Sequence, residues 1–441
     1  MSREHLRSEL ANIDAALAEH ASKTTDPPSD LLERRKSVQL RLDEIVSVSC
    51  LPPEIISEVF IKYTEGLFRE RPAFTLLLLK ICQLWRYIAL STPPLWDDLT
   101  FMTNGSCTNE IVAECVRDWL SCAGSTQRLT LYGHLTKEAT NLTHAILLRQ
   151  SASLDDLSLL MDADATWALE NIGQFTRLRK LTLGSLSRHP DFARVEAFRT
   201  APLLTKVSFG HRSSSRFAVL PWAQLTIVEA DGFVANECLT LLRDARMLKK
   251  CTFGQIRDME DDAAASTRVV HTSLEQLTIS GSVAHLVPCL VLPALRTLSM
   301  APTRDSTTPI SLAWLRTTPA LCTLKLERLT SEIAYGFLSA LNRAADPRFL
   351  PQLRTLEIHT LYVDIDGQVL DALRSRYADP DSESSTSTVH FQSLRIVCGQ
   401  SHYHIGWEEA GDIDWDGMDE LYCRGLDIHV GPQTQNFLEE W

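Results

Sequence analysis

A six-residue unit, Leu178-Arg179-Lys180-Leu181-Thr182-Leu183, recurs along most of the chain. Its apolar residues stand at the first, fourth and sixth positions, and the last two are spaced like neighbours on one face of a β-strand. Full copies occupy residues 154–159, 178–183, 204–209, 225–230, 248–253, 274–279, 295–300, 321–326, 353–358 and 391–396. A weaker copy ends in Leu129 and Leu131. We therefore expect one short strand in each copy.

The spacing of the copies predicts a solenoid of the α/β class. Measured at the fourth position, successive copies lie 21 to 28 residues apart up to Leu324, and then 32 and 38 residues apart. One copy cannot bury its own apolar face, so neighbouring copies have to stack. The pattern resembles the leucine-rich repeat family, and the resemblance implies an irregular β/α horseshoe over residues 127–400. The Asn or Cys that follows the unit in that family is missing from most copies; Leu183, for example, is followed by Gly184.

In such an array, the residues that alternate with the buried ones face the concave surface. We expect target binding by six of them: Lys180, Lys206, Lys250, Gln276, Lys325 and Glu357. Because the protein is otherwise acidic, the lysines of this set would form a mildly basic strip that attracts an acidic or phosphorylated ligand. The alternative interpretation is an ordinary solvated strand face.

Residues 51–96, which precede the array, have the pattern of two or three short helices. Pro52 and Pro53 suit a first helical turn. A wide apolar face follows, made by Ile55, Ile56, Val59, Phe60 and Tyr63. A second apolar stripe comprises Leu78, Ile81, Cys82, Trp85, Ile88 and Ala89. We expect Cys82 and Trp85 in the core, but so short a segment cannot bury all of its apolar surface and needs a partner.

The same segment resembles the F-box. The resemblance rests on the Leu-Pro start at Leu51, the Cys-x-x-Trp-Arg pattern at Cys82 and the closing residues 93–96. It is strongest to the F-box proteins abundant in mushroom-forming fungi. The resemblance implies a three-helix module over residues 50–97 that binds the Skp adaptor of a cullin–RING ubiquitin ligase. The adaptor-facing residues are expected to be Leu51, Pro52, Ile55, Ile56, Phe60, Leu79 and Trp96.

The remaining parts of the chain are expected to support these two regions. Residues 1–49 carry apolar residues at heptad-like spacing on both sides of a Pro-containing turn, which indicates a coiled-coil-like helical hairpin. The hairpin either supports the next module or serves as an oligomerisation device. Residues 98–126 are expected to form a linker with a helix at residues 109–121, and residues 401–441 a C-terminal cap.

The composition argues against several classes of partner. The 441 residues carry a formal net charge of −13, which disfavours binding to nucleic acid or to an anionic membrane surface. No stretch reaches the roughly 18 apolar residues that a membrane helix needs. Eleven scattered cysteines without a CxxC pair indicate reduced thiols, as in the cytoplasm or nucleus.

The sequence holds little that indicates catalysis. It lacks a G-x-S-x-G, an H-E-x-x-H, a P-loop and a G-x-G-x-x-G motif, so we expect neither an enzyme nor a bound cofactor. Asp412, Asp414 and Asp416 copy the first half of a calcium loop, but its twelfth position is Cys423 rather than a glutamate. Two histidines and two cysteines near it fit no standard zinc spacing: His402, His404, Cys398 and Cys423.

Together these features predict a substrate-receptor subunit of a Skp–cullin–F-box (SCF) E3 ubiquitin ligase. The F-box would bind the Skp adaptor, and the repeats would bind a protein target. The alternative is a non-degradative interaction scaffold that carries an F-box.

Overall fold

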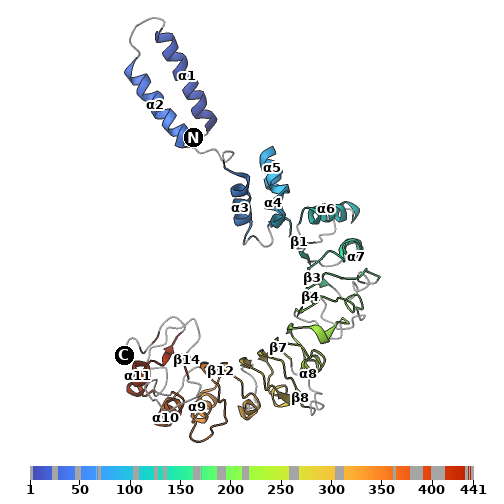
Figure 1. Ribbon diagram of the computed structural model, residues 1–441, viewed down its shortest axis with the longest axis vertical. Helices are drawn as coiled ribbons and strands as arrows, with labels where there is room; N and C mark the ends of the chain where they lie inside the picture. The colour runs from blue at the N-terminus through green and yellow to red at the C-terminus, as the bar shows by residue number, and fades with distance from the viewer. Residues whose placement is uncertain are drawn as a thin grey trace. The chain divides into compact units, whose positions relative to one another are not determined.

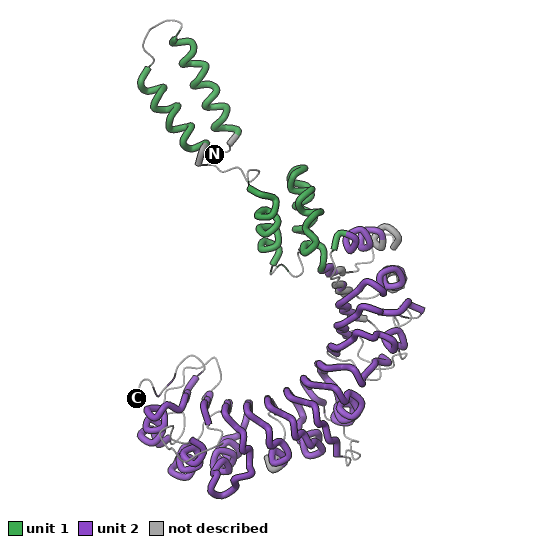
Figure 2. The backbone as a smooth tube through the Cα atoms, viewed as in Figure 1, with its two compact units in different colours: residues 1–97, 122–124 green, residues 98–121, 125–441 purple. Residues whose placement is uncertain are grey.

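The structure is a computed structural model of the 441-residue chain. It describes residues 3–21, 28–44, 51–65, 67, 71–102, 109–123, 128–132, 137–161, 169, 171–185, 195–210, 218–257, 268–302, 312–360, 364–377, 391–398, 413–432, 436 and 438. The chain forms two compact units (Figure 2). Unit 1 comprises Met1–Asp97 and Cys122–Gly124, and unit 2 comprises Asp98–Ser121 and Ser125–Trp441.

Unit 1 begins with a helical hairpin, as the heptad-like spacing predicts. Two helices pack side by side (Figure 1): α1 (Arg3–Ala21) and α2 (Ser29–Glu44). Leu6, Ile13 and Val38 form its buried core. Two ion pairs join the helices: Arg34 to Glu9 at 2.8 Å and Arg35 to Asp14 at 2.6 Å. Exposed pairs of this kind add little stability, so the hairpin depends mainly on its apolar stripe.

A second group of helices in unit 1 comprises α3 (Pro53–Thr64), α4 (Arg71–Ile81), α5 (Gln83–Leu90) and the 3-10 turn η2 (Pro93–Leu95). Pro53 stands in the first turn of α3, where a missing N–H costs nothing. Cys82 separates α4 from α5, because its backbone is extended and its sulfur accepts a hydrogen bond from the Trp85 N–H. The prediction that Cys82 is a core residue is therefore wrong: the cap position leaves it exposed.

The residues that follow α5 fold back onto this group of helices. Trp96 is 3% exposed, and its indole Nε1 donates to the Ala89 carbonyl at 2.7 Å. Leu95 is fully buried. The ring centroids of Phe60 and Trp85 lie 4.8 Å apart, which brings α3 against α5. The helices α3 to α5 and η2 therefore form one module with a small core of its own.

Over its described residues, unit 2 is built on an open parallel sheet, which comprises 13 strands. Figure 1 shows the strands side by side. The strands of this sheet are β1 (Asp98–Met102), β2 (Arg128–Tyr132), β3 (Asp156–Met161), β4 (Lys180–Ser185), β5 (Lys206–Phe209), β6 (Ile227–Asp231), β7 (Lys250–Ile256), β9 (Gln276–Gly281), β11 (Thr297–Pro302), β12 (Thr323–Leu329), β13 (Thr355–Thr360), β14 (Ser393–Cys398) and β15 (Asp427–Gly431). A separate two-stranded sheet pairs β8 (Val269–Val270) with β10 (Leu290–Val291). The solenoid-like α/β arrangement is as expected.

Helices and 3-10 turns connect the strands. The helices are α6 (Asn109–Cys122), α7 (Lys137–Gln150), α8 (Ala235–Asp244), α9 (Ser331–Ala340), α10 (Gly367–Arg376) and α11 (Trp415–Cys423). The 3-10 turns are η5 (Trp222–Gln224), η6 (Val287–Cys289) and η7 (Leu312–Thr317). Figure 1 shows α8, α9 and α10 on the outer side of the sheet. We call the other side, which these helices leave uncovered, the open face.

The strand register confirms every predicted strand. The fourth-position residues pair with one another across the sheet: Leu129, Leu157, Leu181, Val207, Val228, Cys251, Leu277, Leu298, Leu324, Leu356 and Leu394. Each is at most 1% exposed. The sheet also extends beyond the expected limits, because Leu99 of β1 pairs with Leu129 and Ile428 of β15 pairs with Leu394. The expected linker and cap therefore each contribute a strand.

In the repeats from β3 to β13, one backbone carbonyl holds the next strand of the main sheet in register. The N–H groups of Arg179 and Lys180 both donate to the carbonyl of Asp155, at 2.8 and 3.1 Å. The same two-donor arrangement recurs at Arg179, Thr205, Thr226, Lys249, Glu275, Arg296, Cys322 and Arg354. We call these the ladder positions; each stands directly before a strand. Backbone groups thus supply the repeated bonds for which the sequence lacks a regular Asn or Cys.

The side chain of Asn436 bonds to the backbone of β15, the last strand in the order of the main sheet. Asn436 Oδ1 accepts from the Val430 N–H at 3.0 Å, and its Nδ2 donates to the Ile428 carbonyl at 3.0 Å. The Asp427 N–H points the opposite way, to the Gln392 carbonyl of the neighbouring repeat. Asn436 therefore occupies backbone groups that another strand would otherwise pair with.

Replacing this side chain is expected to open the edge. Asn436→Ala should raise the fraction of self-associated protein at a given concentration, because unpaired edge strands pair with other chains. Sedimentation velocity measures the change, with Asn141→Ala on the exposed side of α7 as the matched control. A monomer fraction equal to that of the wild type would show that the edge needs no such cover.

Candidate functional site

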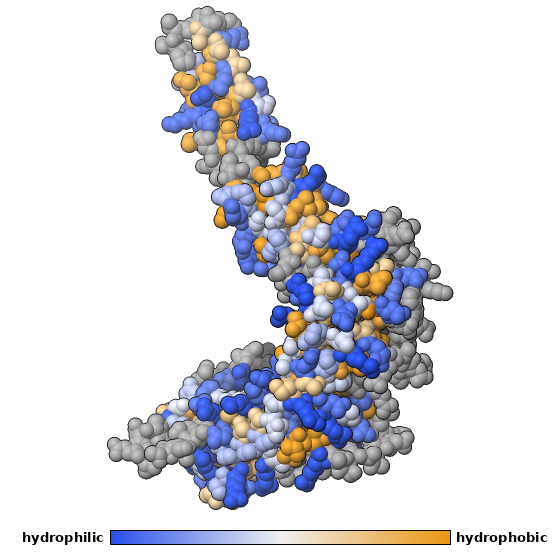
Figure 3. All heavy atoms as spheres, turned by 45° about the vertical axis from the view of Figure 1, so that its right-hand side comes forward, coloured by the Kyte–Doolittle hydropathy of each residue, from blue (hydrophilic) through white to orange (hydrophobic). Residues whose placement is uncertain are grey.

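Large apolar side chains are concentrated on the surface of α3, α4 and α5. Among the described residues, 16 large apolar side chains are exposed, and nine of them belong to these three helices. They are Ile55, Val59, Tyr63, Leu76, Leu77, Ile81, Leu84, Tyr87 and Leu90, and their exposed fractions run from 37% to 70%. We call them the exposed apolar set. Figure 3 shows hydrophobic side chains on this part of the surface. A concentration of this kind on so short a segment marks an interaction surface.

Helix α3 carries two apolar stripes, one residue apart. Ile56 and Phe60 face inward and are 1% and 2% exposed. Ile55, Val59 and Tyr63 have the same spacing of four residues but face outward, each at least 50% exposed. The expectation that Ile56 and Phe60 face an adaptor is therefore wrong, because these two side chains fill the core between α3 and its neighbours.

The other expected adaptor contacts divide in the same way. Pro52 is exposed, Leu51 and Leu79 are half-buried, and Trp96 is buried through its hydrogen bond to Ala89. Trp96 is thus a further correction. The sequence places Leu76 and Leu77 outside the second apolar stripe, on apolar surface that needs a partner, but the expected adaptor contacts do not include them. They do not include the outward residues of α5 either.

On unit 2, the side chains that alternate along the strands with the buried fourth-position residues lie on the open face. Lys180 Nζ lies 2.8 Å from Asp156 Oδ2 of the preceding strand. Lys206 Nζ lies 2.6 Å from Glu229 Oε1, and Ser208 donates to the other oxygen of Glu229 at 2.8 Å. Burial alone would raise the pKa of Glu229, but the hydrogen bonds from Lys206 and Ser208 lower it.

A second charged cluster lies on β12 and β13. Lys325 Nζ lies 3.0 Å from Glu357 Oε1 and 3.1 Å from Glu327 Oε1. Glu357 Oε1 also lies 2.5 Å from His359 Nε2. Burial alone would raise the pKa of Glu357, but the hydrogen bonds from His359 and Lys325 lower it. Glu357 is therefore ionised at neutral pH and is held between two donors.

The predicted basic strip is wrong in its charge. Three of its lysines, Lys180, Lys206 and Lys325, are paired with carboxylates, while Lys250 and Gln276 are exposed. The sequence reasoning missed the partner carboxylates Asp156, Glu229 and Glu327. Asp156 and Glu229 could have been found, because they hold the same alternating positions in their own repeats. The six expected target contacts thus share the open face with about as many acidic groups as basic ones.

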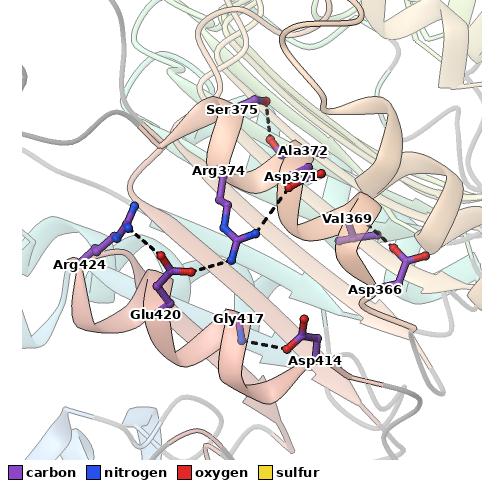
Figure 4. A network of polar contacts seen from close by, with 10 residues as sticks. All are labelled: Asp366, Val369, Asp371, Ala372, Arg374, Ser375, Asp414, Gly417, Glu420 and Arg424. Atoms are coloured by element: carbon purple, nitrogen blue, oxygen red, sulfur yellow. Dashed lines mark hydrogen bonds and ion pairs between the residues drawn. The ribbon is translucent and has the colours of Figure 1, made fainter.

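A cavity of about 580 Å³ lies at the N-termini of α10 and α11, lined by Tyr335, Asp364, Ile365, Asp366, Ile413 and Asp414. Two of its carboxylates serve as helix caps (Figure 4). Asp366 accepts a hydrogen bond from the Val369 N–H at 3.0 Å, and Asp414 accepts one from the Gly417 N–H at 2.9 Å. The calcium-like spacing at Asp414 is thus explained by helix capping.

Close by, Arg374 joins α10 to α11 (Figure 4). Its guanidinium lies 2.6 Å from Glu420, which also lies 2.6 Å from Arg424. Within the part of the chain that the structure describes, no three His, Cys, Asp or Glu side chains form a group that could hold a metal ion. His402, His404 and Asp412 lie outside the described residues.

No model of a known protein family matches the chain, and no curated protein matches it either. Among the described helices, none is both long and apolar enough to cross a membrane. The candidate sites therefore rest on the geometry of the exposed apolar set and of the open face.

The charged cluster on β12 and β13 predicts a pH-dependent contribution to stability. The pKa of Glu357 is lower in the folded chain than its ordinary value of 4.5, so the ionised carboxylate stabilises the fold. This stabilisation is fully present above pH 4.5 and is lost as the pH falls through the pKa that Glu357 has in the folded chain. Glu357→Gln should lower the free energy of unfolding at pH 7 by about 0.5–1 kcal/mol, the range for partly exposed pairs.

Urea unfolding at several pH values measures this loss. The difference between Glu357→Gln and the wild type should shrink once the pH drops below about 4.5. Glu332→Gln, on the exposed surface of α9, is the matched control and should change stability by no more than a few tenths of a kcal/mol. A difference that stays constant with pH would contradict the assigned pairing.

Proposed function

We propose that the chain is a substrate-receptor subunit of an SCF-type E3 ubiquitin ligase. In this proposal, α3, α4 and α5 form an F-box that binds the Skp adaptor, and the open face of unit 2 takes up a protein target. The observation that carries the proposal is the exposed apolar set, which lies within the segment whose sequence resembles the F-box.

The exposed apolar set has the chemistry of a helix-binding interface. Ile55, Val59 and Tyr63 form a stripe along α3, the arrangement by which an amphipathic helix enters an apolar groove. Tyr63 also packs edge-on against Phe74, with ring centroids 5.6 Å apart, which fixes its orientation. Tyr87, at 70% the most exposed of the set, supplies an aromatic anchor on α5. A partner that covers these side chains removes apolar surface from water, which favours association.

Unit 2 supports the second half of the proposal. Its parallel strands carry one row of buried fourth-position residues, most of them leucines. This arrangement is consistent with a degenerate leucine-rich repeat array, which we propose as its fold family. An array of this kind offers a long, rigid surface on which a protein target can lie across several strands. The open-face ion pairs then act as fixed donors and acceptors rather than as a field of one sign.

In this function the chain carries out no chemical step itself. It would bring a target lysine close to the ubiquitin thioester held by other subunits, which raises the effective concentration of the reacting groups. We expect the chain to act in the cytoplasm or nucleus, where the eleven cysteines would remain reduced.

The outer stripe of α3 provides the test. Ile55→Asp/Val59→Asp should weaken binding to a purified Skp adaptor at least thirtyfold, because about 2 kcal/mol is the loss on removing an interface anchor. Both side chains are exposed, so the folded chain should tolerate the change, and circular dichroism checks this. Isothermal titration calorimetry measures the affinity.

Leu148→Asp on α7 is the matched control, because Leu148 is 52% exposed and lies outside the three helices. It should bind the adaptor as the wild type does. If the folded wild type does not bind the adaptor, the receptor function is wrong. The exposed apolar set would then belong to an interaction scaffold with another partner.

A further inference from the structure

The ladder positions carry a second set of positive charges, distinct from the open-face lysines. A ladder residue uses its carbonyl to hold the next strand, so its side chain is free to vary. Four of these residues between β4 and β13 are basic: Arg179, Lys249, Arg296 and Arg354. We call these four residues the basic rim.

The basic rim differs from Lys180, Lys206 and Lys325 in its surroundings. All four side chains are exposed. None of them forms an ion pair with any residue in the described ranges, whereas Lys180, Lys206 and Lys325 are each paired within 3.1 Å. The carboxylates at neighbouring ladder positions are few. Asp155 is paired with Arg177 at 3.2 Å, and Glu275 stands between Lys249 and Arg296 in the strand order.

The spacing of the rim suits an extended ligand. From β4 to β13 the sheet takes seven steps of about 4.8 Å, so the rim extends over about 34 Å. Basic residues recur after three steps and then after two steps twice, which is about 10–14 Å apart. An extended peptide of about ten residues, at roughly 3.3 Å each, covers this length.

The charge of the whole chain narrows the kind of ligand. The chain carries a net charge of −13, so a long polyanion such as a nucleic acid, which extends well past the rim, also meets the acidic remainder of the surface. A short acidic stretch of polypeptide meets only the local field of the rim. We propose that the basic rim binds an acidic, extended segment of the protein target. This inference rests on the proposed receptor function in taking the target to be a protein.

A labelled deca-glutamate peptide is the probe, and fluorescence anisotropy at low salt measures its binding to the full chain. The wild type should bind it, and the affinity should fall as salt is added. Lys249→Glu/Arg296→Glu should lower the affinity at least tenfold. Arg243→Glu/Arg348→Glu, which makes the same change of charge at exposed positions outside the rim, should alter it less than twofold.

Three results would overturn the proposal: no binding by the wild type, equal loss in both double variants, or tighter binding of a single-stranded oligonucleotide than of the peptide. Adaptor binding is measured on the same samples and should be unchanged in Lys249→Glu/Arg296→Glu. If the wild type binds the adaptor but not the peptide, the proposal for the basic rim is wrong and the receptor function is unaffected. If the wild type binds the peptide but not the adaptor, the receptor function is wrong and the proposal for the rim is unaffected.

Discussion

The sheet of unit 2 depends on one recurring interaction, in which a single carbonyl accepts two N–H groups of the next repeat. This bond fixes where the strands from β4 to β14 in the main sheet start, so the fourth-position residues from Leu181 to Leu394 line up in one buried row. A slip by one residue would turn that row outward and would place charged side chains in the core. The backbone thus holds the register, and the side chain of each ladder position is left free for other uses.

That division of roles explains the two kinds of positive charge on unit 2. Residues inside the strands face neighbours only one strand away, and opposite charges there form pairs, as Lys206 does with Glu229. The basic ladder residues lie just outside the strands and form no ion pair with a described residue, as with Arg296 and Arg354. The same sheet therefore combines a nearly neutral open face with the basic rim, which lies at the starts of the strands.

Much of this fold could be predicted from the sequence, because the apolar pattern of each repeat predicts one strand. Strand β1 could also have been predicted, since Trp96, Leu99 and Phe101 have the spacing of the six-residue unit. Strand β15 could not, because Gly425 stands where the unit has its first apolar residue. On α3, both Ile55 and Ile56 are apolar, so spacing alone could not decide which one faces inward. The charge of the open face depends on pairs between repeats more than 20 residues apart, such as Lys180 and Asp156, and a single repeat does not reveal them.

In the proposed function the two units have different roles: α3, α4 and α5 bind an adaptor, and unit 2 remains available for a target. Hydrogen–deuterium exchange of the full chain, with and without the Skp adaptor, distinguishes these roles. Adding the adaptor should slow exchange in α3, α4 and α5 and leave exchange in the strands of unit 2 unchanged. Unchanged exchange in the three helices, or protection confined to unit 2, would contradict the proposed function.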